Sequence, residues 1–335
     1  MLTIVFRAVW HVPFSVAGFQ HSACVFGVPS APESEQETIQ MARIFIVGSG
    51  VVGTATGKGF LNAGHQVSFI DVAPQRLDHL RSQGLDARAE LDLAAEPDAF
   101  IFLTLPTPNV GHRYDLSAFE AGTASVGEAL ADATATHVVV VRSTVPPGTA
   151  EGLVQPLLEK HSGKTVGEGF SLASNPEFLR AATAVEDFRH PWMTVIASRS
   201  IRTRERLAEL LAPFGGETRT FSNPAEAEFV KCAHNIYNAT KISFWNEMWL
   251  VGQHLGLDLD PIAQTVARSA EASYNPHYGI RGGAPYGGVC LPKDTQGFLG
   301  LAAAIGVDMP LLKAVVAVND KLAEVAEMEA EALTA

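Results

Sequence analysis

The octapeptide Gly287–Asp294 (GGVCLPKD) carries the side chains best suited to covalent chemistry. Cys290 supplies a thiol, whose thiolate form is a strong nucleophile. Lys293 follows three residues later, where an ammonium group stabilises a thiolate. Gly287 and Gly288 allow a ligand to approach the backbone closely. The alternative is a buried cysteine that packs as a small hydrophobe. The glycine pair and the Lys-Asp pair favour the reactive cysteine.

Composition limits the classes of function. The chain has 335 residues, of which 47% are hydrophobic, and this length predicts about two domains. A formal net charge of −12 argues against nucleic acid as a partner. No apolar run reaches the ~20 residues of a membrane span. Three scattered cysteines predict neither a disulfide framework nor a metal site and favour a cytoplasmic location.

Residues 1–41 differ from the rest of the chain because they show no sustained hydrophobic period. We predict a non-native or disordered extension, with Met41 as the natural start. A weak targeting segment is the alternative, although His11 and Pro13 interrupt its apolar stretch.

Residues 43–47 (RIFIV) predict a buried strand, and a glycine-rich turn and a helix follow it. This context makes the GxGxxG pattern a dinucleotide-binding motif, in which the pyrophosphate meets the helix N-terminus. Asp71 ends the next predicted strand and is expected to bind the adenosine ribose, which favours NAD over NADP. The motif residues predicted to bind NAD are Gly48, Gly50, Val52 and Gly53.

Two further predicted strands, 99–105 and 137–141, end in Thr-Pro or Ser-Thr segments. Ligands of open parallel sheets bind at the carboxyl ends of the strands. Thr107 and Thr144 are therefore candidates for the nicotinamide side of the cofactor, the alternative being ordinary turn residues.

A long helix is predicted from Pro224 to about Leu255, with Asn223 as its N-cap. Lys231, Asn235, Asn238 and Ile242 share one face of it, which indicates either a binding site or a solvent-exposed face. Beyond it we expect a loop rich in Gly, Tyr and Pro, and helices over 295–305 and 310–333. The predicted fold is α/β: an N-terminal Rossmann-like, doubly wound parallel sheet (42–222), then an all-helical central domain (223–335).

Several segments resemble, in chain order, the nucleotide-sugar dehydrogenases, a family that includes UDP-glucose 6-dehydrogenase and GDP-mannose 6-dehydrogenase. They are GSGVVG, LPTPN, RSTVPPGT, SNPEFLR, AEFVKCAHNIYNATKISFWNE and GGVCLPKD. The resemblance spans about residues 42–325. It implies an NAD-dependent, two-step oxidation of a nucleotide-sugar C6 alcohol to the carboxylate for polysaccharide biosynthesis, with UDP-glucose as the expected substrate.

The resemblance also implies a reaction path. The first hydride leaves C6, the Cys290 thiolate adds to the aldehyde, a second hydride leaves the thiohemiacetal, and water hydrolyses the thioester. Lys231 and Asn235 are implied to stabilise the oxyanion. Asp294 is implied to hold that lysine or the attacking water, Thr144 to position a water that acts as base, and Glu177 to assist thioester hydrolysis.

The remaining site residues follow from the same motifs. Arg76, Thr107 and Lys293 are implied to contact NAD. The expected substrate-binding residues are Phe178, Leu179, Lys231, Asn235, Tyr286 and Gly287. Many members carry a second glutamate where this chain has Ala181.

The family further implies a homodimer through the long helices and a C-terminal UDP-binding domain, which we expect to be absent from this chain. Two other functions stay open. One is a truncated, inactive, dimeric NAD-binding remnant of such an enzyme. The other is a one-step β-hydroxyacid-type dehydrogenase, which has no need of Cys290.

Overall fold

The computed structural model describes residues 41–269, 283–288 and 290–334. The predicted N-terminal extension, except Met41, lies outside the described residues. Most of the loop predicted before Cys290 also lies outside them.

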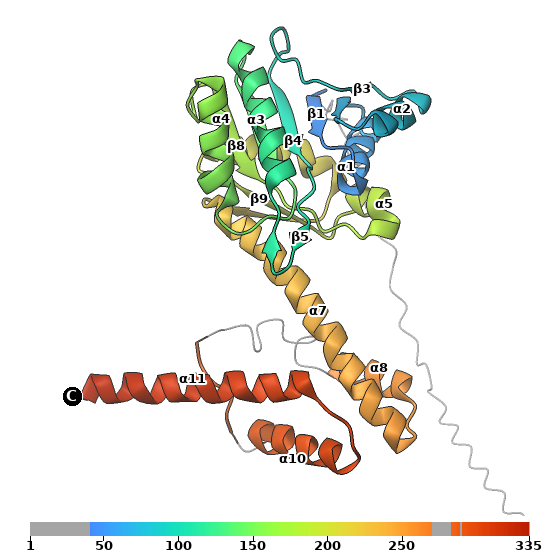
Figure 1. Ribbon diagram of the computed structural model, residues 1–335, viewed down its shortest axis with the longest axis vertical. Coiled ribbons are helices and arrows are strands. Elements are labelled where there is room, and N and C mark those ends of the chain that lie inside the picture. Colours follow the sequence, from blue (N-terminus) through green and yellow to red (C-terminus); the bar gives the residue numbers. More distant parts are fainter. Residues whose placement is uncertain (1–40, 270–282, 289, 335) are drawn as a thin grey trace, which may run out of the picture. The chain divides into compact units, whose positions relative to one another are not determined.

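An eight-stranded sheet forms the centre of the N-terminal region (Figure 1). Its order is β10-β9-β8-β7-β4-β1-β2-β3. The strands pair in parallel from β3 to β8, as in the register Ile44↔Val67. The strands are β1 (Arg43–Val47), β2 (Gln66–Ile70), β3 (Ala87–Arg88), β4 (Ala99–Leu103), β7 (His137–Val141), β8 (Phe170–Ser174), β9 (Met193–Ala197) and β10 (Glu217–Phe221).

One pairing departs from the predicted all-parallel sheet. Strand β9 joins β8 in antiparallel fashion through Ser174 and Ala197, and β10 then lies parallel to β9. For β9 to lie parallel to β8, the chain would have to cross back to the end of the sheet at which β8 begins. Here the chain leaves β8, forms the short helix α5 (Ala184–Arg189) against α1 (Val51–Asn62), and re-enters the sheet directly.

Helices cover both faces of the sheet because its strands are apolar on both sides. On one face β1, β4 and β7 pack with Phe119, Leu130 and Leu158 of α3 and α4. On the other face they pack with α1, α2 and α6, through side chains that include Phe60 and Leu207. The remaining elements here are α2 (Pro74–Ser82), α3 (Ser117–Asp132), α4 (Gln155–Ser162), α6 (Ile201–Leu211), the hairpin β5 (Asn109–Val110) with β6 (Arg113–Tyr114), and the single turns η1 (Ala150–Val154), η2 (Ala181–Thr183) and η3 (Ala212–Phe214).

Past the sheet, the regular structure of the described residues is helical: α7 (Pro224–Leu255), α8 (Leu259–Ser269), α10 (Cys290–Ala304) and α11 (Pro310–Thr334). Helix α7 begins with a capping box. The Asn223 side chain accepts a hydrogen bond from the backbone N–H of Glu226, and the Glu226 side chain accepts one from the backbone N–H of Asn223. The bounds predicted for α7 are therefore confirmed. Among the described helices none combines the length and apolarity needed to cross a membrane.

The predicted α/β fold class with a helical second part is confirmed, with two corrections to element bounds. The strand predicted over 99–105 ends at Leu103. The helix predicted from Thr295 begins at Cys290, so the cysteine lies in the first helical turn rather than in a loop. The predicted domain boundary at 222/223 falls in the short link between β10 and α7.

His137, at the start of β7, is fully buried, and neither ring nitrogen has a hydrogen-bond partner among the described residues. Burial lowers the pKa of His137, and Lys164 adds to this effect while Asp98 and Glu96 oppose it. The unfolded chain, with a histidine pKa of about 6.5, therefore binds a proton that the folded chain resists. We expect the free energy of unfolding to fall as the pH drops below that value.

The His137→Val variant tests this expectation in urea unfolding at pH 7.5, 6.5 and 5.5. Below pH 6.5 the free energy of unfolding should decrease less steeply with falling pH in the variant than in the wild type. The difference in slope should reach at most about 1.4 kcal/mol per pH unit, the contribution of one proton. His79→Ala, a change at an exposed position on α2, is the control and should keep the wild-type dependence. An unchanged pH dependence in His137→Val would contradict the prediction.

Candidate functional site

The glycine-rich turn between β1 and α1 is packed so tightly that only glycine fits at two of its positions. Gly48 has φ +94°, and a Cβ there would lie 2.7 Å from the Thr104 carbonyl oxygen. A Cβ on Gly53 would lie 2.0 Å from the Gly48 carbonyl oxygen. Gly50 is the N-cap of α1, and Val52 follows in its first turn. The turn thus exposes a helix N-terminus of the kind that binds a pyrophosphate.

Asp71, at the carboxyl end of β2, is held beside this turn. Its Oδ2 accepts hydrogen bonds from the backbone N–H and the hydroxyl of Ser49, and Oδ1 accepts one from the Ala73 N–H. Burial acts to raise the pKa of Asp71, but the hydrogen bonds from Ser49 and Ala73 outweigh it and the net pKa is lowered. An ionised carboxylate here fits a ribose diol. Arg76 extends over the same turn, 3.3 Å from the position of a Cβ on Gly50.

The two predicted threonine loops lie together. The Thr107 hydroxyl donates a hydrogen bond to the Thr144 carbonyl oxygen at 2.7 Å. The loops follow β4 and β7, which are neighbours in the sheet. Their contact therefore places both threonines at the carboxyl edge of the sheet, on the side where the dinucleotide turn also lies.

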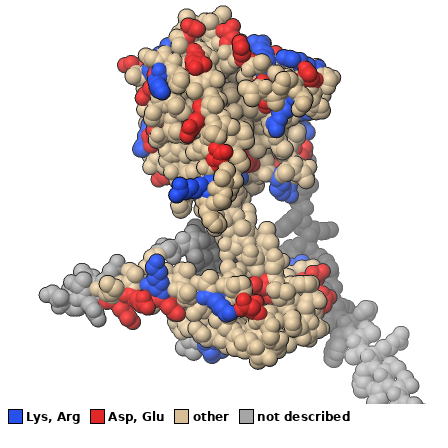
Figure 2. Space-filling model, viewed as in Figure 1, with Lys and Arg blue, Asp and Glu red and all other residues tan. Residues whose placement is uncertain are grey.

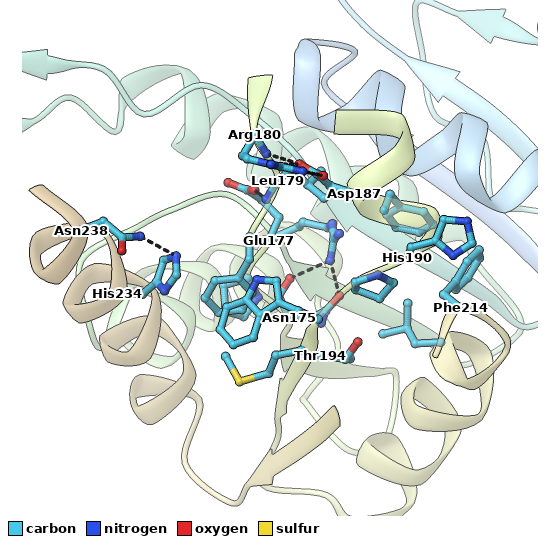
Figure 3. Close-up of a pocket in the computed structure, with 18 residues that line it drawn as sticks. Asn175, Glu177, Leu179, Arg180, Asp187, His190, Thr194, Phe214, His234 and Asn238 are labelled. Atoms are coloured by element: carbon cyan, nitrogen blue, oxygen red, sulfur yellow. Dashed lines mark hydrogen bonds and ion pairs between the residues drawn. The ribbon is translucent and has the colours of Figure 1, made fainter. Parts of the chain in front are cut away.

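A buried ion pair joins the sheet region to α7. Lys231 Nζ lies 3.1 Å from Glu177 Oε1, and the two side chains are only 6% and 11% exposed. The other oxygen of Glu177 accepts the Leu179 N–H. Beside the pair is a cavity of about 520 Å³, whose wall includes Glu177, Phe178 and Leu179 (Figure 3). Three of the residues predicted from the SNPEFLR motif, together with Lys231, are thus brought to one place.

Arg142, the first residue of the RSTVPPGT motif, belongs to this site but was not predicted. Its guanidinium is buried and donates to the Asn175 carbonyl oxygen, the Asn175 side-chain oxygen and the Thr56 hydroxyl. Desolvation lowers the pKa of Arg142 to about 10, and nearby Glu177 opposes this effect. Arg142 therefore holds the backbone just before Glu177. An Arg that follows directly on a buried strand was the available signal.

Glu228 was missed as well. It is 3% exposed, and it accepts hydrogen bonds from the N–H groups of Gly148, Thr149 and Ala150. This contact fixes the first turns of α7 to the loop after β7. Lys231 lies three residues further along the same helix face and is positioned by it.

The stripe predicted on α7 is divided. Lys231 is buried, whereas Asn235, Asn238 and Ile242 are exposed. Asn238 also lines the cavity, where its amide lies 3.0 Å from His234 Nε2 (Figure 3). The assignment of Asn235 to the oxyanion stays a prediction.

The residues predicted around Cys290 form a separate group. Cys290 is a free, exposed thiol, so the alternative of a buried hydrophobe is wrong. Asp294 pairs with the neighbouring Lys293 rather than with Lys231, at 2.6 Å. The Tyr286 N–H donates to the Asn319 side chain of α11. Gly287 is exposed. The catalytic and ligand-binding roles of these residues stay predictions.

Ala181, where the family pattern has a second glutamate, is exposed at the start of η2. The next carboxylate of the cavity wall is Asp187. It is engaged by Arg180, whose hydrogen bonds lower the pKa of Asp187. The structure therefore ties this carboxylate to the loop and gives it no free proton-transfer role.

A dinucleotide turn at the edge of a Rossmann-type sheet, with a lysine–glutamate pair beside a cavity, defines an NAD-dependent oxidoreductase. Residues 81–215 match the NAD binding domain of the UDP-glucose/GDP-mannose dehydrogenase family, and residues 225–321 match its central domain. Residues 43–116 also match the family described as NADP oxidoreductase coenzyme F420-dependent. The chain belongs to the UDP-glucose/GDP-mannose dehydrogenase family.

Individual relatives agree with this assignment. UDP-glucose 6-dehydrogenase of Haloferax volcanii is 34% identical over 82% of this chain and 69% of its own length. The crystal structure of GDP-mannose dehydrogenase from Pseudomonas aeruginosa matches with a TM-score of 0.77 and 30% identity, over 84% of this chain and 69% of that one. A UDP-glucose dehydrogenase from Pyrobaculum islandicum matches with a TM-score of 0.64 and 34% identity, over 85% and 69%.

Asp71→Ala should weaken NAD⁺ binding and relax the preference for NAD⁺ over NADP⁺, because it removes the ribose acceptor and the charge that repels a 2′-phosphate. We expect a loss in NAD⁺ affinity of roughly tenfold, as for the removal of one charged hydrogen-bond acceptor. Isothermal titration calorimetry with both cofactors measures this. Asp78→Ala, a change at an exposed position on α2, is the control. An unaltered NAD⁺/NADP⁺ affinity ratio in Asp71→Ala would exclude the assigned role.

Proposed function

We propose that this chain oxidises the C6 alcohol of a nucleotide sugar to the carboxylate in two NAD-dependent steps, with UDP-glucose as the preferred substrate. The observation that carries the proposal is the buried Lys231–Glu177 pair beside the cavity. Lys231 is 6% exposed and is paired with Glu177, which lines the cavity, so a buried cation is held directly behind the ligand space. A four-electron oxidation needs such a cation for each oxyanion that develops at C6.

The chain supplies the remaining parts of the chemistry. NAD⁺ bound at the glycine-rich turn would supply the oxidant, and two NAD⁺ molecules, bound one after the other, would each take up one hydride. The Cys290 thiolate forms a carbon–sulfur bond to the aldehyde, and loss of the second hydride from this thiohemiacetal leaves a thioester. Water then breaks the carbon–sulfur bond and returns the thiol. Glu177 assists this water, and its contacts with Lys231 and the Leu179 N–H support the assignment by holding the carboxylate beside the cavity.

Other assignments extend this proposal. Thr144 positions a water near C6, Asn235 helps Lys231 with the oxyanion, and Asp294 orients the hydrolytic water. Phe178, Leu179, Tyr286 and Gly287 bind the sugar nucleotide, while Thr107, Arg76 and Lys293 contact NAD. We place the reaction in the cytoplasm, where a reducing environment keeps Cys290 as the free thiol that the mechanism requires.

Counting NADH per sugar tests the four-electron reaction. Purified protein is given NAD⁺ with UDP-glucose, UDP-N-acetylmannosamine or GDP-mannose. We expect two NADH for each UDP-glucose, because both hydrides leave the same carbon. Cys290→Ala should lower the rate of carboxylate formation by at least about a hundredfold, since it removes the nucleophile. Cys232→Ala is the matched cysteine control.

Each other outcome contradicts the proposal in its own way. One NADH per substrate, with Cys290→Ala fully active, would indicate a one-step dehydrogenase. NAD⁺ binding without turnover of any sugar would indicate an inactive remnant. A higher rate with GDP-mannose would keep the reaction and change the substrate.

We further propose that a second copy of this chain covers α7. The helix is buried only near its ends, and every residue over 235–244 is exposed in the single chain. A helical segment without packing on any side is marginal in water. Figure 2 shows few charged atoms along the visible side of α7. The large apolar side chains of α7 that are 40–65% exposed are Phe229, Ile236, Tyr237, Ile242, Phe244, Trp249 and Leu250.

Light scattering after size-exclusion chromatography tests the dimer. We expect about twice the chain mass of 35.7 kDa. Ile242→Lys should shift the mass toward one chain, because a lysine at a covered apolar position is costly. Val72→Lys is the control, since Val72 is 90% exposed outside the helical part. A wild-type mass of one chain at micromolar concentration would refute the dimer.

A further inference from the structure

Three aromatic rings form one wall of the cavity beside the Lys231–Glu177 pair. Trp192 stacks on His234 with ring centroids 5.6 Å apart and an interplanar angle of 27°. Phe178 meets both rings edge-on, at 5.5 Å from Trp192 and 5.0 Å from His234. Trp192 joins the group from just before β9, Phe178 from the loop after β8, and His234 from α7. Three separate elements thus contribute to one aromatic cluster, in which Trp192 and His234 are stacked and Phe178 contacts both edge-on.

Trp192 is fixed although it is 58% exposed. Its carbonyl oxygen accepts the Glu217 N–H, which anchors the backbone to β10. Gly216, with φ +80°, packs so closely that a Cβ there would lie 2.3 Å from the Pro191 carbonyl oxygen. On its other side the ring is supported by His234, which the Asn238 amide holds in place. A large ring that is both rigid and open to the cavity is already organised to bind a ligand.

The platform lies close to the reacting groups. Lys231 Nζ is 5.3 Å from the Phe178 ring centroid, and Phe178 touches Trp192. The cavity wall near the platform also offers Thr194 and Asn238, which are neutral hydrogen-bonding groups. Neutral donors and acceptors around an aromatic face suit a ring with hydroxyls at its rim and C–H groups on its face. A diphosphate would instead require free cations, and Arg180 in this wall is paired with Asp187.

We propose that Trp192 is the platform on which the hexose ring of the substrate lies, and that it thereby sets the position of C6 relative to Lys231. The inference rests on the proposed function and adds a substrate-positioning residue to it. The C–H face of the hexose packs on the indole, which contributes burial of apolar area and weak C–H contacts. The nucleobase lies beyond the sugar and does not touch Trp192.

Binding measurements on the full chain test the platform. Calorimetry is run with UDP-glucose, with UDP and with NAD⁺ on wild type, Trp192→Ala and Trp192→Phe. Trp192→Ala should weaken UDP-glucose binding by roughly threefold to tenfold, the scale of one aromatic contact. UDP and NAD⁺ affinities should not change, and Trp192→Phe should recover most of the loss. In kinetics, the KM for UDP-glucose should rise more than kcat falls.

Intrinsic fluorescence supplies a second readout. UDP-glucose should change the emission of the wild type and of Trp249→Phe but not that of Trp192→Phe, because Trp192 and not Trp249 meets the sugar. An unchanged UDP-glucose affinity in Trp192→Ala overturns the platform while the proposed function stands. Equal losses for UDP and UDP-glucose also overturn it, because the base rather than the sugar would then lie on the ring. Wild-type protein that neither binds nor oxidises UDP-glucose overturns both this inference and the preferred substrate.

Discussion

The structure of the site depends on the burial of the Glu228 carboxylate against the loop after β7. This carboxylate accepts three backbone N–H bonds and lies within 3.3 Å of the Ser174 hydroxyl. Burial raises the pKa of Glu228, because desolvation outweighs these hydrogen bonds. A buried charge tolerates little displacement from its donors, since an unpaired one costs several kcal/mol. The start of α7 is therefore held in one register, and Lys231 meets Glu177 in that register.

A second buried glutamate near the other end of α7 also accepts backbone N–H hydrogen bonds from another segment. Glu247 is 7% exposed and accepts the N–H groups of Leu311 and Leu312 at the start of α11. A helix N-terminus leaves such N–H groups unpaired and attracts negative charge. One helix thus has two internal glutamates that cap other segments. The long exposed stretch between the two glutamates has no comparable contact among the described residues. For this reason we propose that a second copy of the chain covers it.

Local signals predicted the cofactor half well. The glycine turn, the acid after β2 and the Asn223 N-cap of α7 each depend on neighbours within a few residues or on one strand–turn–helix unit, and each lies at its predicted position. A general rule of parallel sheets predicted that Thr107 and Thr144 lie at the carboxyl edge of the sheet, and the structure adds the hydrogen bond between them. Arg142 and Glu228 were not found, because their partners lie 33 and about 80 residues away. The residues adjacent to a charged side chain in the sequence do not indicate which distant backbone or side-chain group it will contact.

Residue order was enough to establish the α/β class, the NAD turn and the family, because these depend on short motifs and hydrophobic periods that survive without knowledge of distant contacts. Folding in three dimensions decided the rest. It turned β9 antiparallel, started α10 at Cys290, buried Lys231 while leaving Asn235 exposed, and brought Trp192, Phe178 and His234 onto one cavity wall. Each of these outcomes depends on which distant segments compete for the same space, and that competition exists only once the chain is packed.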